Sequence, residues 1–350
     1  MRRFFSEVQQ LRFLDLLEAC MMASLFFQKF KAVSVKRQPN NLKPNAFGHK
    51  VNMIPVQFGR VNMNQTDRHC LLNNPGRLLH KIESRLARQD TAADWMHADG
   101  GGIRGSAVLF LLTECRAAPG KKPEPCLLLN KRSRQVTQPG DLCCPGGGIT
   151  QVDRVMSGFM PPPMAALHKW PRWFRWRVKQ RQAARRVMQA WTAGLREAWE
   201  EIRLNPLKVT LLGLLPVQQL TMFRRLIFPL TAWVPAYPRL KPNWEVARVI
   251  YVPLRCLLDP ENYGRYRLSF QAGQPPVGGT NEYPCFIHQG RQGTEILWGA
   301  TFRITMDFLR IALDFSYPAM EALPVVWGKR DITYLNGSVW EPAPAGRPDR

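Results

Sequence analysis

The chain has 350 residues and a formal net charge of +23, with 49 Lys and Arg against 26 Asp and Glu. Hydrophobic residues make up 45% of it, which is enough for a core of ordinary size. The charge predicts an anionic partner, which could be a phosphorylated substrate, a nucleic acid or an acidic lipid surface.

Cysteine usage and hydropathy exclude further classes of protein. The eight cysteines are scattered and include no CxxC pair, so neither a disulfide framework nor a zinc site is expected, and a reducing cytosol is the plain interpretation. No run reaches about 18 uninterrupted apolar residues, so a transmembrane helix is not expected. The predicted location is cytoplasmic, with peripheral membrane contact as an alternative.

The N-terminal part of the chain shows little regular pattern. Apolar and charged residues in the first 30 positions are compatible with an amphipathic helix that packs, contacts a partner or lies on a membrane. Residues 33–95 have many turn-forming residues and little periodicity, which favours an extension or a poorly ordered leader. We therefore assign residues 1–100 to an extension, partly disordered or helical, and residues 331–350 to a C-terminal tail.

Regular elements are predicted between residues 101 and 330, which we assign to one domain. Two apolar runs, 107–112 and 126–129, indicate strands. The apolar spacing over 181–204 predicts a long helix that ends before Asn205-Pro206. Further strands are expected at 209–215, 226–233, 245–252 and 295–297, and a last helix at 300–313. This order predicts a mixed α/β (α+β) domain.

Three carboxylates within the long predicted helix are the first chemical signal. Glu197, Glu200 and Glu201 are spaced i, i+3 and i+4, which places them on one helical face. Such a triplet is often only a solvated acidic face. Here the 42 residues from 154 to 195 contain no acid at all, so an isolated acidic cluster lies in a basic neighbourhood. Oxygen ligands of this kind suit Mg²⁺ or Mn²⁺.

A glycine-rich turn, Pro145-Gly146-Gly147-Gly148, lies upstream, with Asp153 shortly after it. Glycine lets backbone groups approach a metal or a phosphate, although alone it more often marks just a turn. Turn and acidic helix together resemble the signature of the Nudix hydrolases, G-x5-E-x7-R-E-U-x-E-E-x-G-U. Gly147 matches the first Gly, Asp153 matches the first Glu, and residues 196–201 match R-E-U-x-E-E.

Two features depart from that signature. The seven-residue spacer has become 42 residues, from 154 to 195, so the resemblance implies an insertion at about 154–183. Arg203 stands where the late Gly is expected. A long insertion can be tolerated because the entropy of loop closure grows only slowly with loop length.

Flanking segments resemble one branch of the family, the coenzyme A diphosphatases. The similar segments are 127–133 (LLLNKRS), 138–147 (QPGDLCCPGG), 245–260 with its EV, VPL and LLDP, and 298–301 (WGAT). An arginine common in that branch is missing near Val136, and Cys144 replaces its usual Phe. The resemblance covers about residues 105–312 and implies a Nudix α/β/α sandwich with a basic, Trp-rich helical insertion.

The resemblance also implies the metal ligands. Glu200 and Glu201 would bind Mg²⁺ or Mn²⁺, with the Gly146 carbonyl as a further ligand. Glu197 would be either another ligand or the general base for the attacking water, and the sequence leaves both roles open.

Other residues would support the metal site or bind the substrate. Arg196 would pair with Asp153 and orient the glycine turn on the helix, so that it supports catalysis indirectly by positioning other groups. Lys131, Arg132 and Gly147 would hold substrate phosphate.

One more carboxylate could belong to the site. Glu245 is either an additional acid, as Asp153 could be too, or merely a residue at the end of a strand. The sequence does not choose between these interpretations.

The implied reaction is metal-assisted hydrolysis of a nucleoside diphosphate linked to another group. From coenzyme A or acyl-coenzyme A the products would be 3′,5′-ADP and (acyl-)phosphopantetheine. Alternative substrates are ADP-ribose, NADH or another dinucleotide. An alternative class is a non-catalytic Nudix scaffold whose basic insertion binds membrane or nucleic acid, although a scaffold has no need of three clustered carboxylates.

Within the insertion, residues 168–181 interleave cations with aromatics. This pattern is compatible with an element that binds an anionic membrane surface, with a nucleic-acid contact, or with a lid that guides an anionic substrate. A packed helical extension with buried aromatics is the fourth interpretation. Nucleic acid is the partner least favoured, and the oligomeric state is not predicted.

Overall fold

The structure is a computed structural model that describes residues 65–89, 91, 95, 104–115, 123–159, 167, 170–220, 225–235, 238–270, 282–290 and 292–330. All of them belong to one compact unit, Met63–Arg350. The helix predicted in the first 30 residues and the tail 331–350 lie outside the described residues. Within the ranges given above, no helix is long and apolar enough to cross a membrane.

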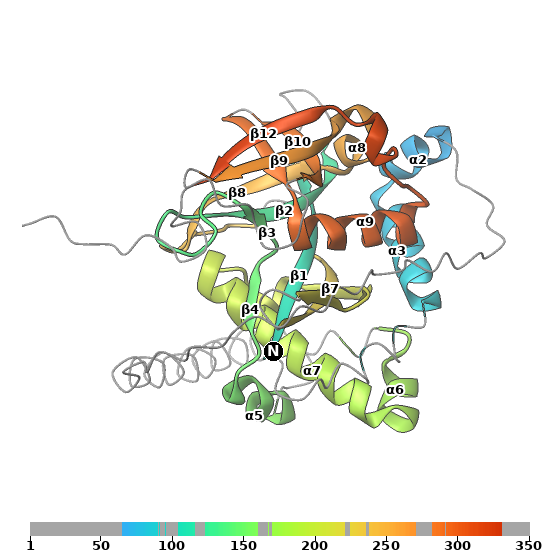
Figure 1. Cartoon of the computed structure of the whole chain (residues 1–350). Helices are drawn as coiled ribbons and strands as arrows, with labels where there is room; N and C mark the ends of the chain where they lie inside the picture. Colours follow the sequence, from blue (N-terminus) through green and yellow to red (C-terminus); the bar gives the residue numbers. More distant parts are fainter. Residues whose placement is uncertain are drawn as a thin grey trace, which may run out of the picture. The chain divides into compact units, whose positions relative to one another are not determined.

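A large mixed sheet forms the centre of the domain (Figure 1). Its strands are β1 (Arg104–Cys115), β2 (Glu124–Arg132), β3 (Leu142–Cys143), β4 (Gly146–Gly148), β5 (Thr210–Leu214), β6 (Gln218–Leu220), β7 (Arg225–Trp233) and β8 (Val246–Pro253). The main order is β3-β2-β1-β7-β5, with β4 on β1, β6 on β7 and β8 on β2. The pair β1 and β7 is parallel, whereas β2 and β4 run antiparallel to β1.

A second, smaller sheet has the order β11-β10-β9-β12. Its strands are β9 (Tyr263–Phe270), β10 (Glu282–Gly290), β11 (Gly293–Leu297) and β12 (Val325–Arg330). The pair β9 and β12 is parallel, and β10 runs antiparallel to both β9 and β11.

Helices cover both faces of the large sheet (Figure 1). They are α2 (Gln65–Leu72), α3 (Pro75–Arg88), α5 (Gln151–Phe159), α6 (Trp173–Lys179), α7 (Arg181–Ile202), α8 (Leu254–Leu257) and α9 (Gly299–Leu313). Along β1, Leu109 packs in the core cluster with α7, whereas the ring of Phe110 lies 4.7 Å from that of Phe308 on α9. Successive strand residues thus face opposite layers, which makes the predicted α/β/α sandwich of a mixed α and β fold.

The long helix α7 positions the acidic cluster. Its buried face includes Val187, Trp191, Leu195, Ala198 and Ile202, which is the face predicted from the sequence. The helix ends where the next residue, at position 203, takes the left-handed conformation with φ 55°. The prediction of a helix over 181–204 is confirmed to within two residues.

The strands predicted at 107–112, 126–129, 209–215, 226–233, 245–252 and 295–297 and the helix predicted at 300–313 are all present. Of the two interpretations of residues 33–95, a poorly ordered leader is wrong for residues 65–88, because they form α2 and α3. Asn74 caps α3 by accepting a hydrogen bond from Arg77 N. Leu78, Ile82 and Leu86 of α3 are buried in the core against the sheet.

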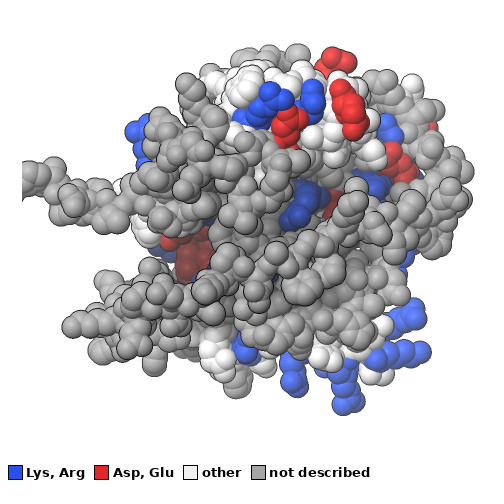
Figure 2. Space-filling view, viewed as in Figure 1, with Lys and Arg blue, Asp and Glu red and all other residues white. Residues whose placement is uncertain are grey.

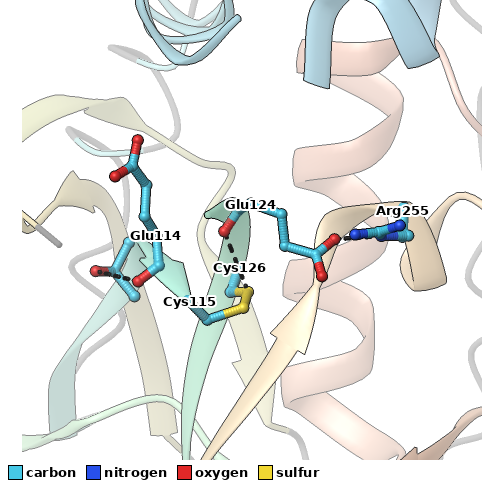
Figure 3. The surroundings of a disulfide bond; sticks show 6 residues. Glu114, Cys115, Glu124, Cys126 and Arg255 are labelled. Carbon is cyan, nitrogen blue, oxygen red and sulfur yellow. Dashed lines mark hydrogen bonds and ion pairs between the residues drawn. A yellow bond between two sulfur atoms is a disulfide. The ribbon is translucent and has the colours of Figure 1, made fainter. Parts of the chain in front are cut away.

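A disulfide joins Cys115 at the end of β1 to Cys126 on β2 (Figure 3). No disulfide framework is expected from the sequence, and the cysteine spacing does not identify this single pair. The two residues are diagonal neighbours across an antiparallel pairing, and their Cα atoms lie 6.0 Å apart, within the range for a disulfide. On the same strand, Glu124 forms an ion pair with Arg255 of α8 (Figure 3).

Candidate active site

The glycine turn lies directly against the acidic end of α7. The backbone N–H of Gly146 on β4 donates to Glu201 Oε2 at 3.1 Å. The same oxygen accepts a hydrogen bond from Asn130 Nδ2 of β2 at 3.0 Å. Glu201 is buried, with 7% of its surface exposed. The long insertion has therefore not displaced the glycines from the helix.

The guanidinium of Arg196 forms hydrogen bonds with most of the other residues of the site. Its Nε donates to Asp153 Oδ1 at 2.7 Å, and its Nη2 donates to Asp153 Oδ2 at 3.0 Å. The guanidinium also donates to Glu197 Oε1 and to Glu200 Oε2, both at 3.0 Å, and to the Gly148 carbonyl at 3.2 Å. The predicted pairing of Arg196 with Asp153 is confirmed. The bond from the same guanidinium to Gly148 joins the glycine turn to the helix.

Asp153 is fully buried and has a second duty in the helix α5. Its Oδ2 accepts hydrogen bonds from the backbone N and the hydroxyl of Thr150, both at 2.7 Å. In return, Asp153 N donates to Thr150 Oγ1 at 3.3 Å. This is a capping box, which explains why the helix begins at residue 151 and holds the carboxylate in place for Arg196.

Two glycines of the turn lie in close contact with neighbouring atoms. A Cβ on Gly147 would lie 2.4 Å from the carboxyl group of Glu197. A Cβ on Gly146 would lie 2.3 Å from the backbone oxygen of Ala107, and Gly146 has φ +149°, which other residues rarely adopt. A Cβ on Gly148 would meet nothing within 4 Å. Position 146 thus requires Gly for its backbone, whereas a side chain at 147 would displace the Glu197 carboxyl group.

The carboxylates of α7 are crowded and partly removed from water. Burial raises the pKa of Glu197 to about 7, with Arg196 opposing that rise. Burial and the charge of Glu197 raise the pKa of Glu201 to about 8. Burial also raises the pKa of Glu245, to which the charge of Glu200 adds, and the charge of Glu245 in turn raises the pKa of Glu201. Glu245 therefore lies beside the acidic cluster, as an additional acid would.

The carboxylate oxygens of α7 are ligands of the kind that a divalent cation prefers, although they are not arranged around a common point. The Glu200 Oε1 atom is buried and has no hydrogen-bond partner, and neither has Asn130 Oδ1. Carboxylates that share one site repel each other unless a cation or a proton neutralises them. Among the described residues, no three His, Cys, Asp or Glu side chains are grouped so as to hold a metal ion. In this arrangement Glu197 and Glu200 are bound to Arg196 instead.

The two predicted phosphate-binding cations are placed differently. Arg132 donates to the carbonyl and the hydroxyl of Thr137, and its charge acts on Glu201 and Glu245. Lys131 forms an ion pair with Glu295 at 2.9 Å, together with Arg248, away from these contacts. Arg132 is therefore near the acidic cluster, whereas Lys131 forms its ion pair with Glu295, outside that cluster.

Sequence reasoning missed two residues of the site. Asn130 binds Glu201, and Thr150 binds Asp153. A Thr-x-x-Asp capping box is readable at 150–153 and could have identified Thr150. No local signal identifies Asn130, because its contact is made across the fold.

Comparisons with known proteins give a distant likeness. No family model and no curated protein matches the chain. Similar solved structures include the Nudix hydrolase RenU from M. smegmatis, with 16% identity, 44% of this chain and 73% of that chain covered, and a TM-score of 0.26. An Ap4A hydrolase from C. elegans has 13% identity and a TM-score of 0.28, and the match covers 45% of this chain and 84% of that chain. A Nudix hydrolase from Alicyclobacillus acidocaldarius has 16% identity and a TM-score of 0.27, and the match covers 45% of this chain and 81% of that chain. Likeness at these identities and TM-scores assigns no activity to this chain.

Proposed function

We propose that the chain is a divalent-metal-dependent hydrolase that cleaves the diphosphate between a nucleoside and another group, with coenzyme A or acyl-coenzyme A as the substrate. The observation that carries this proposal is the meeting of three parts distant in the sequence. Gly146 contacts Glu201, and Arg196 binds Asp153, across a spacer of 42 residues from 154 to 195. A chance acidic face on a helix would not have a glycine turn bound to it.

Glu200 and Glu201 would hold Mg²⁺ or Mn²⁺, with the Gly146 carbonyl and Glu197 as further candidates. The bound ion would neutralise diphosphate oxygens and lower the pKa of a water. The unpartnered Glu200 Oε1 supports this assignment, because a buried carboxylate oxygen with no donor is unfavourable without a cation.

The protein residues would handle positioning and the proton. In the hydrolysis, a water oxygen forms a bond to one phosphorus, the bridging P–O bond breaks, and the proton of the water passes to a carboxylate. Glu197 is our candidate base, because a pKa of about 7 allows it to accept a proton near neutrality. Arg132 would bind a phosphate oxygen, since its guanidinium lies near the acidic cluster.

The choice of coenzyme A is supported by the segments that resemble the coenzyme A diphosphatases. In the fold these segments meet. Trp298 Nε1, at the start of α9, donates to Asp141 Oδ1 at 3.2 Å. The strands β3 and β8, which carry two of the other segments, both pair with β2. Products from coenzyme A would be 3′,5′-ADP and phosphopantetheine.

The test is a panel of coenzyme A, acyl-coenzyme A, NADH and ADP-ribose, each incubated with the full chain and Mg²⁺ or Mn²⁺. We expect 3′,5′-ADP from coenzyme A or its acyl esters, and a loss of turnover by orders of magnitude in Glu200→Gln and Glu201→Gln. Glu261→Gln, an exposed residue in a 3-10 turn, is the matched control. Near-normal turnover in either site variant would remove the metal assignment. Products from ADP-ribose or NADH alone would change the substrate, and no product from any diphosphate would favour a scaffold.

A further inference from the structure

The helix α6, inside the insertion, has two faces of different character. Trp173 and Trp176 are buried in the core cluster that contains α7, and Trp170 packs edge-on against Trp176 with ring centroids 5.2 Å apart. The interpretation of the insertion as a packed extension with buried aromatics is thus correct for these tryptophans. They fix the helix on the domain, so its outer face is held in one orientation.

The outer face exposes apolar side chains among cations. Phe174 is 67% exposed and Val178 is 71% exposed, and they are spaced i, i+4 on one side of the helix. The exposed cations of α6 and of the start of α7 are Arg175, Arg177, Lys179, Arg181 and Arg185. No acid occurs from residue 154 to residue 196. In Figure 2, Lys and Arg gather at the lower right, where Figure 1 has α6, without Asp or Glu among them.

A cavity of about 230 Å³ opens beside this face. It is lined by Arg172, Arg175, Trp176 and Gln180. The Arg172 guanidinium donates to the Gln89 carbonyl at 2.7 Å, so Arg175 is the exposed cation of this lining, and a guanidinium beside a cavity suits an anionic oxygen group such as a phosphate. The cavity lies on the same helix as the exposed Phe174 and Val178.

We propose that α6 and the first turn of α7 dock the protein on a membrane that contains anionic phospholipid. Phe174 and Val178 would enter the boundary between headgroups and acyl chains, the exposed cations would bind the negative surface, and the cavity would receive one headgroup phosphate. Charge complementarity supports this occupant, and the exposed apolar pair distinguishes it from a free anion. Nucleic acid is less well matched, because the three tryptophans that could stack on bases are buried.

The test is co-sedimentation of the full chain with vesicles of phosphatidylcholine alone or mixed with phosphatidylserine. We expect binding only to the mixed vesicles. Arg175→Gln/Arg177→Gln/Lys179→Gln should lower the affinity by about fivefold for each cation removed. The matched control is Arg154→Gln/Lys208→Gln/Arg239→Gln, which removes three exposed cations elsewhere and should bind like the unchanged chain.

A second variant separates lipid insertion from simple charge attraction. Phe174→Ser/Val178→Ser should lower vesicle affinity tenfold or more, because about 0.8 kcal/mol is lost for each buried methylene. Val155→Ser, at a residue 55% exposed on α5, is its control. Hydrolysis of soluble substrate should be the same in all of these variants, so the docking proposal and the proposed activity can fail separately.

Three results would overturn the docking proposal. The first is equal binding to vesicles with and without phosphatidylserine. The second is vesicle binding that is unchanged by both variants. The third is displacement of the protein from the vesicles by a single-stranded oligonucleotide at equal salt, together with unchanged vesicle binding by Phe174→Ser/Val178→Ser. That result would assign the surface to nucleic acid.

Discussion

Arg196 and Asp153 are 43 residues apart in the sequence, yet the guanidinium and the carboxylate form two parallel hydrogen bonds of 2.7 and 3.0 Å in a buried site. The carboxylate has no exposed surface, and the Arg196 side chain is 4% exposed. The same guanidinium reaches Gly148. One ion pair thus fixes the insertion's first helix, the glycine turn and the acidic helix to one another.

Removal of Asp153 should therefore destabilise the whole domain. We expect Asp153→Ala to lower the free energy of unfolding by about 3 to 5 kcal/mol, because a buried guanidinium is left without its main partner. Urea unfolding followed by circular dichroism measures the change. The control is Arg310→Ala, which breaks an exposed ion pair with Asp307 and should change stability by about 1 kcal/mol or less. Equal effects of the two substitutions would contradict a structural role for the buried pair.

The raised pKa values make the stability of the metal-free protein depend on pH. An unfolded Glu has a pKa near 4.5, whereas the folded pKa is about 7 for Glu197 and about 8 for Glu201. Between these values the folded chain binds more protons than the unfolded chain, so the stability that these two groups contribute is greatest at low pH and falls as pH rises to about 8. Each group should lower the free energy of unfolding by about 1 kcal/mol per pH unit in its window.

The check is urea unfolding in a chelator at several pH values from about 5 to about 8. Glu197→Gln/Glu201→Gln should remove most of the downward slope, since neither amide ionises. Glu261→Gln should keep it, because that side chain is exposed. A double variant with the slope of the unchanged chain would show that other groups cause it.

A divalent ion should reverse the penalty of crowded carboxylates. At a Mn²⁺ concentration about 100 times its dissociation constant, we expect a gain of about 2.7 kcal/mol in the free energy of unfolding. The gain should be larger near pH 8 than near pH 5, because the ion competes with protons for Glu201. Thermal unfolding with and without Mn²⁺ measures it. If Glu200→Gln and Glu201→Gln gain as much as the unchanged chain, the ion binds elsewhere.

The sequence predicts those parts of the fold that are encoded locally. The apolar spacing of α7 and the runs of β1 and β7 are read directly from residue order. The helix α3 is also readable locally, since its buried residues Leu78, Ile82 and Leu86 are spaced i, i+4 and i+8 among polar ones, but the turn-forming residues around it favour the interpretation as a leader. In β9, buried Tyr266 and Leu268 alternate with arginines, which is the pattern of a half-buried strand, although the predicted strands do not include it.

Contacts across the fold are less readable. The Arg196–Asp153 pair was predicted only because the family resemblance supplied it. Nothing local indicates that Cys115 will lie beside Cys126, since their proximity depends on the register of β1 on β2. The burial of Asn130 against Glu201 likewise depends on how the sheet packs on α7.

Arg203 occupies a backbone conformation that favours glycine. It ends α7 with φ 55° and ψ 36°, and Leu204 N donates back to the Ala198 carbonyl. Its guanidinium lies 5.4 Å from the Trp199 ring, which offsets part of the backbone strain. We expect Arg203→Gly to stabilise the protein by about 0.5 to 1 kcal/mol, measured as a rise in the urea midpoint. Arg203→Ala, which keeps the strain and loses the ring contact, should be destabilising, and the opposite order of the two variants would refute this account.

Two neighbouring glycines provide a test of how closely the turn must approach the helix. A Cβ at Gly147 would lie 2.4 Å from the Glu197 carboxyl group, whereas a Cβ at Gly148 would meet nothing within 4 Å. Because the Glu197 side chain can bend away, Gly147→Ala should change stability by only about 1 kcal/mol. The displaced carboxylate should nevertheless lower kcat about 100-fold, since a shift of about 1 Å misplaces a catalytic group. Gly148→Ala should keep normal kcat, so steady-state rates of the two variants on the same diphosphate substrate decide the matter. If both variants had equal rates, Glu197 would not need the position that Gly147 allows, and its assignment as the base would have to be given up.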